Sequence, residues 1–332
     1  MRRVLAVLGA VLMVTVALLV RSALNDDDDD AGDGHRGGGD RVLTLLCAEE
    51  LADACEVLED EGRAEVQIEA VGETVDRLGV VDAALEVDAW LTLDPFAQQV
   101  NDRRLFATGN ALFADPIPTG VSSELALVTQ DDRGVALEAD CVEVGWACVG
   151  DAAGEPWADH EGETAWGPVK PGYDAPDTSA TGLLVLAQAT ADHLDDPGFA
   201  GQDIDERWLG DLEDAVPTRT AGSSLLRLAQ QGGAAFGAVG ALRADAEAVA
   251  GTAQGGDLTI FYPAPMFQAS VVVAPGRGAG EDLLDALVDL ADGDNELVDA
   301  LLAAGWSDRA DGTEPLPSAG VLDALRSAWE AS

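Results

Sequence analysis

The residues best suited to hold a ligand form a hydroxyl-rich run at Thr178, Ser179 and Thr181, followed directly by Gly182. We expect a helix to begin here, and the first turn of a helix leaves backbone N–H groups unpaired and carries partial positive charge. Hydroxyl groups at that place either cap the helix or donate to a ligand oxygen, and glycine lets a backbone approach closely. The run predicts a site for an oxyanion- or carboxylate-bearing solute, with a plain helix cap as the alternative.

Further polar residues follow expected strands or precede expected helices, and ligands of open α/β sheets bind at the carboxyl ends of strands. The additional candidates are Cys47, Ala48 and Glu49 after the first strand, Asp94 after the third, Thr220 beside Arg219, and Tyr262 between two late strands. Each has a structural alternative. These are a helix start held by a disulfide, a helix cap at Asp94, a surface ion pair of Arg219 and a core aromatic at Tyr262.

The four cysteines indicate disulfides rather than a metal site. Their number is even, three connectivities are open, and the local pairs Cys47–Cys55 and Cys141–Cys148 are the expected ones. Each would close a short loop and stabilise modestly. Zinc is the alternative, but the sequence has no Cys-x-x-Cys, and the histidines are distant from the cysteines in the chain.

Motifs of catalysis are absent from the sequence, so we expect a protein that is not an enzyme and holds neither cofactor nor metal. It has no Gly-x-Ser-x-Gly elbow and no His-Glu-x-x-His, and its 62 acidic residues prevent spacing from singling out a glycosidase pair. The Gly-rich segment 275–280 lacks the spacing of a dinucleotide loop. Four tryptophans invite a sugar-stacking interpretation, but core packing is the expected role of Trp90, Trp146, Trp157 and Trp166.

The chain is strongly acidic, with a formal net charge of −44 over 332 residues. This charge excludes a nucleic-acid binder that neutralises phosphates, and it argues against docking on anionic lipid through a basic surface. Hydrophobic residues make up 47% of the sequence, enough for a sizeable core in about two domains. A single lysine, Lys170, among many arginines indicates a GC-rich, actinobacterial-like genome.

The amino terminus predicts export. Arg2 and Arg3 precede an apolar run that ends at Val20, and an acidic, Gly-rich stretch follows. We expect residues 1–24 to be an uncleaved signal anchor, with a cleaved signal peptide as the alternative, and residues 25–40 to be a linker. The body would then lie on the extracellular face of the membrane, or be secreted if the segment is cleaved.

The body alternates expected strands and helices, a pattern typical of α/β sheets. Apolar runs predict strands at 41–46, 64–71, 87–93, 125–129, 234–239, 258–262 and 270–273. Helical spacing predicts helices at 48–59, 94–100, 180–194, 206–215, 222–231, 242–249, 281–290, 295–303 and 321–331. The Gly-, Trp- and acid-rich stretch 131–171 predicts loops with short strands.

The order of these elements resembles a known class of protein. In chain order, the segments that carry the resemblance are LTLLCAEELADACEVL, DAWLTLDPFAQQV, WGPVKPGYDAPDTSATGLLVLAQA and DLTIFYPAPMFQASVVVAP. Over residues 41–332 the chain resembles an extracellular solute-binding protein of the type 2 periplasmic class, the receptor component of ABC importers. The order of elements carries this resemblance, and no single motif is specific to the class.

The resemblance implies two α/β lobes, each a mixed, mostly parallel sheet flanked by helices. Lobe one would comprise 41–128 plus 258–332, and lobe two 129–257, with a ligand in the cleft and hinge closure around it. It also supports the local disulfides, because bonds between the lobes would oppose the hinge.

The resemblance further implies a receptor that captures a small polar solute for an ABC permease or a membrane sensor. A tethered sensing or scaffold module of the same fold is the first alternative, and a secreted hydrolase is the second. No nucleic-acid partner is expected.

Overall fold

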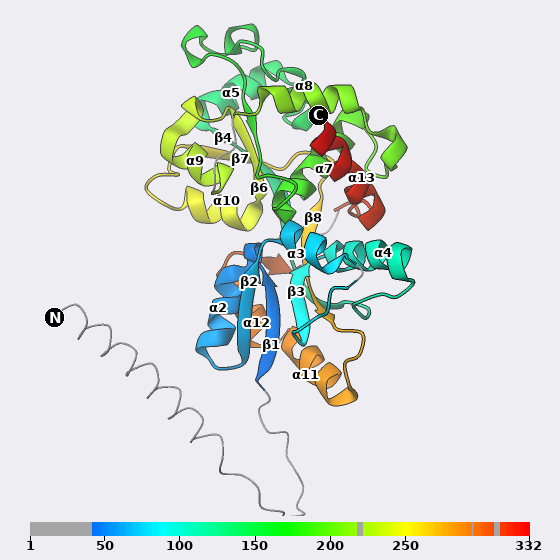
Figure 1. Ribbon diagram of the computed structural model, residues 1–332. Coiled ribbons are helices and arrows are strands. Elements are labelled where there is room, and N and C mark those ends of the chain that lie inside the picture. Colours follow the sequence, from blue (N-terminus) through cyan, green and yellow to red (C-terminus); the bar gives the residue numbers. More distant parts are fainter. Residues whose placement is uncertain (1–41, 81, 218–221, 294, 309–312) are drawn as a thin grey trace, which may run out of the picture. The chain divides into compact units, whose positions relative to one another are not determined.

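The computed structural model describes residues 42–80, 82–217, 222–293, 295–308 and 313–332 (Figure 1). The expected anchor at 1–24 and linker at 25–40 lie outside the described residues. Within the described ranges, no helix combines the length and the apolarity that a membrane span requires.

A first mixed sheet is built from both ends of the body. Its strands run in the order β2 (Ala64–Glu69), β1 (Leu43–Ala48), β3 (Ala89–Leu93), β8 (Gln268–Pro275) and β4 (Ile117–Gln130). Strand β1 pairs in parallel with β2 and β3, whereas β8 is antiparallel to both β3 and β4. The short β9 (Ser307–Asp308) pairs with β4.

A second mixed sheet is formed around the later half of β4. Residues 125–130 of that strand pair antiparallel with β6 (Ala238–Leu242) and β7 (Leu258–Phe261). The two-residue β5 (Pro171–Gly172) pairs in parallel with β6. Strand β4 therefore runs from the first sheet into the second, and the chain between β7 and β8 makes the return crossing.

Helices cover both sheets (Figure 1). Those around the first sheet are α2 (Ala52–Asp60), α3 (Val71–Leu78), α4 (Phe96–Thr108), α11 (Glu281–Ala291) and α12 (Glu296–Ala303). Those around the second are α5 (Asp131–Asp140), α6 (Trp146–Asp151), α7 (Ala180–Leu194), α8 (Glu206–Ala215), α9 (Ser224–Gln231) and α10 (Arg243–Ala250). The described residues also form five short 3-10 turns, namely η1 (Glu49–Leu51), η2 (Trp157–Asp159), η3 (Thr164–Trp166), η4 (Gly201–Asp203) and η5 (Gly232–Ala234).

The carboxy-terminal helix α13 (Ala319–Ala331) contacts elements of both groups. It packs against α4 and also against α7 and α8. The guanidinium of Arg326, which is 7% exposed, pairs with Asp76 of α3 at 2.6 Å. Helix α13 therefore contacts helices of both sheets, in addition to the two places where the chain itself crosses from one sheet to the other.

The expectation of loops with short strands for residues 131–171 was wrong. Two helices, α5 and α6, occupy much of this stretch. Asp131 and Asp132 stand in the first turn of α5, where acidic side chains complement the helix dipole. In α6 the apolar Trp146 and Val149 lie three residues apart and are fully buried. The high content of glycine and acidic residues favoured a prediction of loops, although the apolar residues that pack into the core have helical spacing.

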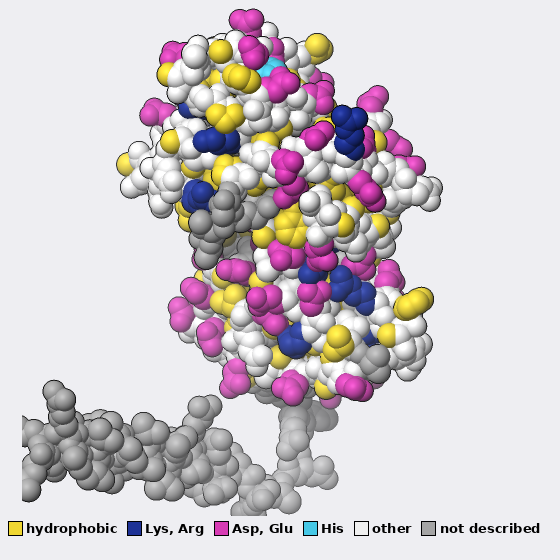
Figure 2. Space-filling view, turned by 45° about the horizontal axis from the view of Figure 1, so that its top comes forward, with side chains coloured by type: hydrophobic (Ala, Val, Ile, Leu, Met, Phe, Trp, Pro, Cys, Tyr) yellow, Lys and Arg dark blue, Asp and Glu magenta, His cyan; other side chains and the backbone are white. Residues whose placement is uncertain are grey.

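The apolar core confirms most of the expected packing roles. Trp90, Trp146 and Trp157 are at most 1% exposed, and Trp166 packs edge-on against Trp157 with ring centroids 5.7 Å apart. The cysteines form the two local pairs Cys47–Cys55 and Cys141–Cys148, as the sequence predicted. Acidic side chains are spread over the whole of the visible surface (Figure 2), in keeping with the net charge.

Candidate functional site

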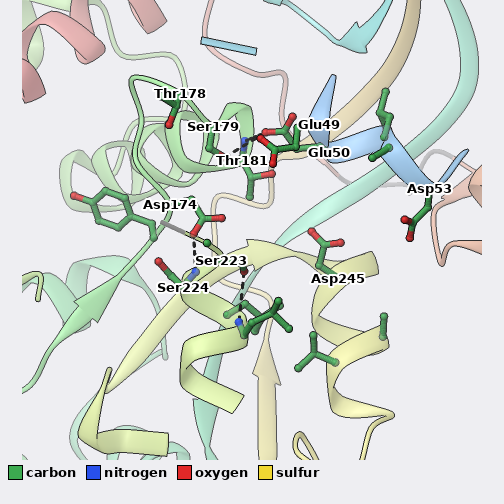
Figure 3. Close-up of a pocket in the computed structure, with 18 of the residues that line it drawn as sticks. Glu49, Glu50, Asp53, Asp174, Thr178, Ser179, Thr181, Ser223, Ser224 and Asp245 are labelled. Carbon is green, nitrogen blue, oxygen red and sulfur yellow. Dashed lines mark hydrogen bonds between the residues drawn. The ribbon is translucent and has the colours of Figure 1, made fainter. Parts of the chain in front are cut away.

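A cavity of about 720 Å³ lies between elements of the two sheets. Its volume is within the range usual for small-molecule sites. The first sheet and its flanking helices, which we call the first-sheet layer, contribute η1, the start of α2, the end of α12 and Trp306 to the lining. The second sheet and its flanking helices, the second-sheet layer, contribute the loop at 173–181, the start of α9, and α10. Figure 3 shows how the polar side chains of these segments face one another.

The start of α7 is at the cavity wall, as the hydroxyl-rich run predicted. Ser179 is the N-cap, and its Oγ accepts a hydrogen bond from the N–H of Gly182 at 3.1 Å. The Thr178 hydroxyl donates to the carbonyl of Ala175 at 3.3 Å. Two of the three candidate hydroxyls are therefore engaged within the chain, and the capping alternative describes Ser179 correctly.

The anion position at the start of α7 is occupied by Glu50 of η1. Its Oε1 accepts hydrogen bonds from the backbone N–H groups of Ala180 at 2.7 Å and Thr181 at 3.3 Å, and from the Ser179 hydroxyl at 3.2 Å. Burial raises the pKa of Glu50 above its ordinary value, and these hydrogen bonds oppose that rise. A carboxylate of the protein itself thus stands where a ligand oxyanion was expected.

The start of α9 has the same arrangement. Asp174, in the loop before α7, accepts a hydrogen bond from the N–H of Ser224 at 2.7 Å through its Oδ1. The Ser223 hydroxyl is the N-cap and accepts from Leu226 at 3.4 Å. The starts of α7 and α9 therefore each carry a carboxyl group supplied by the chain.

Two more carboxylates face the same space from α10 and α2. Asp245 is open to the water of the cavity, yet the surrounding walls raise its pKa to about 6, with further contributions from the negative charges of Glu50, Asp174 and Asp53. Figure 3 places Asp245 and Asp53 on the side of the cavity across from α7. Neither forms an ion pair with any described residue.

Three buried polar atoms of lining residues lack a hydrogen-bond partner among the described residues. They are Oγ1 of Thr181, a residue that is 6% exposed, Oε2 of Glu50 and Oδ1 of Asp177. Apolar side chains complete the lining, including Leu225, Leu301 and Trp306. The cavity therefore offers hydrogen-bond acceptors, negative charge and an apolar wall.

Of the remaining candidates that the structure describes, Glu49 lines the cavity and Cys47, Ala48, Asp94 and Tyr262 do not. Cys47 and Ala48 are fully buried in β1, so only Glu49 of that trio lines the cavity. Asp94 precedes α4 but does not cap it, and burial raises the pKa of its carboxyl. Tyr262 is 44% exposed at the return crossing, where its hydroxyl donates to Glu247 at 3.3 Å.

Thr220 and its neighbour Arg219 lie outside the described residues. Gly222, the first described residue after them, lines the cavity.

Sequence reasoning missed most of the acidic lining. Glu50 follows a nominated residue, but its partners are about 130 positions away, so no local pattern reveals the contact. Asp174 lies within a segment that carries the resemblance, but only the hydroxyl-bearing residues of that segment were predicted to bind a ligand. Asp245 lies in the first turn of α10, where an acidic residue is ordinary.

Two glycines allow backbones to approach closely, and the partner in each case is the chain itself. A Cβ on Gly182 would lie 2.2 Å from the carbonyl oxygen of Asp174. A Cβ on Gly72 of α3 would lie 1.9 Å from the carbonyl oxygen of Asp177, and the Gly72 N–H donates to the Thr178 carbonyl at 2.8 Å. Gly72 thus marks a direct contact between the first-sheet layer and the loop before α7.

Solved structures similar to this chain are periplasmic binding proteins. A periplasmic thiamin binding protein aligns with a TM-score of 0.58 at 14% identity, covering 90% of this chain and 99% of that one. A periplasmic binding protein from Actinobacillus pleuropneumoniae, with exogenous fructose-6-phosphate bound, gives 0.56 at 14% identity over 87% and 97%. A sulfate-binding protein from Mycobacterium tuberculosis gives 0.52 at 13% identity over 85% and 96%.

These similarities establish the fold. The chain has the mixed α/β architecture of two-lobed periplasmic binding proteins, as the order of its elements predicted. No family model matches the sequence, and no curated protein matches it either.

Proposed function

We propose that this protein is an extracytoplasmic receptor that captures a small solute and delivers it to an ABC-type importer. The observation that carries the proposal is the 720 Å³ cavity, whose walls come from elements of both sheets. The similar structures are binding proteins, which supports a role in binding rather than in catalysis.

The two lobes would be 41–128 plus 258–332 and 129–257, joined through β4 and the return crossing. At that crossing the side-chain amide of Gln188 in α7 donates to the carbonyls of Pro263 at 3.2 Å and Pro265 at 3.0 Å. A solute that contacts both walls would favour their closed arrangement, because hinge closure increases its contacts.

Export would follow from the amino-terminal sequence. Basic residues before the apolar run at 4–20 and acidic residues after it favour an amino terminus inside and a body outside. The segment would serve as an anchor, or as a signal peptide if it is cleaved.

The similar structures do not select one ligand class, because their names refer to thiamin, fructose-6-phosphate and sulfate. The sequence favoured an oxyanion at the start of α7. Glu50 occupies that position, so an anionic solute would have to displace the carboxylate or bind elsewhere in the cavity. The side chains of the whole lining are therefore a better guide to the class of ligand than the start of α7 alone.

A panel of amino acids, amines, oxyanions, sugars and short peptides tests the receptor function by thermal shift, with calorimetry on any hit. A receptor gains about 2.7 kcal/mol of unfolding free energy when the free ligand is at 100 times its Kd. A rise in melting temperature with one solute class supports the proposal. Silence across the panel contradicts it.

The second candidate is a tethered sensing or scaffold module of the same fold that no longer binds a solute. The carboxylate of Glu50 at the start of α7 favours this candidate, because it fills the position that could otherwise bind an oxyanion. Such a module would show no solute-dependent stabilisation in the panel but would still fold and reach the cell surface.

A further inference from the structure

The charges that line the cavity are predominantly negative. Six carboxyl-bearing residues contribute to the described lining, namely Glu49, Glu50, Asp53, Asp174, Asp177 and Asp245. Arg227 is the one basic residue among the described lining residues, and its guanidinium lies over the ring of Phe236, 4.8 Å from the centroid. The described part of the lining therefore carries six carboxyl groups and one guanidinium.

The two helix starts do not change this balance. The partial positive charge of a helix start is about half an elementary charge. Glu50 at α7 and Asp174 at α9 each bring a carboxyl group to such a start. These two positions are compensated within the protein, and Asp53 and Asp245 remain as additional negative groups.

Three buried polar atoms point to the kind of group that is missing. Oγ1 of Thr181, Oε2 of Glu50 and Oδ1 of Asp177 belong to lining residues and have no hydrogen-bond partner in the described part of the chain. A buried acceptor without a donor is costly, and an N–H group of a ligand would satisfy it. The carboxylate oxygen is an acceptor when ionised, and the hydroxyl can accept as well.

Apolar side chains in the same lining indicate an organic ligand. Trp306 is 6% exposed and Leu301 is fully buried, and together with Leu225 they give the cavity an apolar portion. The described residues contain no group of three or more His, Cys, Asp or Glu side chains arranged to hold a metal ion.

We propose that the solute is a small organic cation whose ammonium or guanidinium N–H groups donate to Thr181 and to the acidic side chains, and whose apolar part packs on Trp306. This inference rests on the receptor function proposed above and names its ligand class. The carboxylates of Asp53 on α2 and Asp245 on α10 supply the opposing charge.

Calorimetry on the full chain tests the ligand class with spermidine, cadaverine, arginine and thiamine as cationic probes. The other arms are anions (sulfate, phosphate, citrate) and a divalent metal (Mn²⁺). Binding by at least one cationic probe and by no anion is the expected result. Binding of an anion or of Mn²⁺ without any organic cation would overturn the inference and leave the receptor function standing, whereas silence in every arm contradicts both.

A matched series on one carbon chain separates charge from hydrogen bonding. Cadaverine carries two ammonium groups, its bis-trimethylammonium analogue keeps the charges without N–H donors, pentanediol is neutral, and glutarate is anionic. The proposal predicts that cadaverine binds tightest, the quaternary analogue binds more weakly, and glutarate does not bind. Equal affinity for cadaverine and pentanediol would contradict a role for charge.

Variants locate the site. Asp245→Asn should weaken binding of the cationic probe by about 10- to 100-fold, the usual effect of losing a hydrogen bond to a charged group. Asp285→Asn on α11, an exposed position away from the cavity, makes the same change in net charge and should leave affinity unchanged. Equal effects of the two substitutions would show that only the overall charge matters and would overturn the site.

Two further variants test the neutral and the basic groups. Thr181→Val keeps the shape of the side chain and removes the acceptor, so we expect a loss of affinity of about tenfold with an unchanged melting temperature. Arg219→Ala should leave cation affinity unchanged or raise it. If the unmodified protein binds anions and Arg219→Ala binds nothing, the solute is anionic and the proposal is overturned.

Discussion

Replacing Glu50 with glutamine keeps the shape of the side chain and removes its charge. In the protein, the Oε1 atom of Glu50 accepts hydrogen bonds from Ser179, Ala180 and Thr181 at the start of α7. An amide oxygen accepts from the same groups, so the variant can keep this helix start paired. The charge itself is costly, because burial is the largest influence on the pKa of Glu50 and raises it.

The expected magnitude follows from these opposing effects. Each tenfold weakening of the acid is worth about 1.4 kcal/mol of folding free energy, and a negative charge at a helix start returns about 0.3–1 kcal/mol. Glu50→Gln should therefore lower the free energy of unfolding at pH 7 by no more than the roughly 0.3–1 kcal/mol that the charge gains at the helix start, and relief of the buried charge acts in the opposite direction. Glu50→Ala removes the acceptor altogether and should lose about 1–2 kcal/mol.

The pH dependence gives the sign. A carboxyl with a raised pKa in the folded protein binds protons more tightly there than in the unfolded chain, whose ordinary value is 4.5. The protein therefore loses stability through this group as pH rises from about 4.5 towards the folded pKa, whereas the glutamine variant does not. In urea unfolding between pH 4 and pH 7, the free energy of unfolding of Glu50→Gln should rise relative to that of the unmodified protein as pH rises.

The comparison of glutamine with alanine is the decisive control. A loss of more than about 2 kcal/mol in Glu50→Gln at pH 7, as large as that in Glu50→Ala, would refute the reasoning, because it would make the charge stabilising rather than costly. Glu50→Ala should in addition acquire affinity for sulfate, since the N–H groups at the start of α7 would then be open to an anion.

Three other outcomes are expected. Gly72→Ala should lower the free energy of unfolding by about 1–3 kcal/mol in urea titrations, because its Cβ would collide with the Asp177 carbonyl, and an unchanged value would mean that the contact is not maintained in solution. Reducing Cys47–Cys55 and Cys141–Cys148 should lower the melting temperature, because each short loop contributes about 2–3 kcal/mol to the free energy of unfolding in the chain-entropy model. Mass spectrometry that finds four free thiols in the untreated protein would contradict both pairs. Calorimetry of a cationic probe should show affinity falling as pH drops through about 6, since Asp245 takes up a proton there beside Glu50, Asp53 and Asp174, and affinity that rises in acid would count against this side chain as a ligand.

Elements with strong local signals could be predicted from the sequence. Helix α7 has the predicted bounds, because Ser179 caps a long apolar run, and α8 likewise begins after the capping side chain of Asp205. The return crossing follows the predicted order, since β7 and β8 belong to different sheets. Short loop closure predicted both disulfides.

Elements that depend on tertiary contacts were less accessible. Helix α3 was not anticipated, although Val71, Val75 and Leu78 are buried at helical spacing, because Val71 was assigned to the end of the preceding strand. In the cavity, the pairing of Glu50 with the start of α7 joins residues about 130 positions apart. The local sequence pattern predicted that this helix start binds a ligand anion. The fold shows that Glu50 of the same chain occupies the position.

Hydrogen–deuterium exchange of the full chain with a saturating cationic probe tests the central claim most directly, because it locates the bound solute on the protein. The account predicts slower exchange in the segments around η1, around 178–181 and at the start of α10, with the exposed part of α11 unchanged. Unaltered exchange in all three segments, under conditions where calorimetry shows the probe bound, would contradict the claim that this cavity is the solute site.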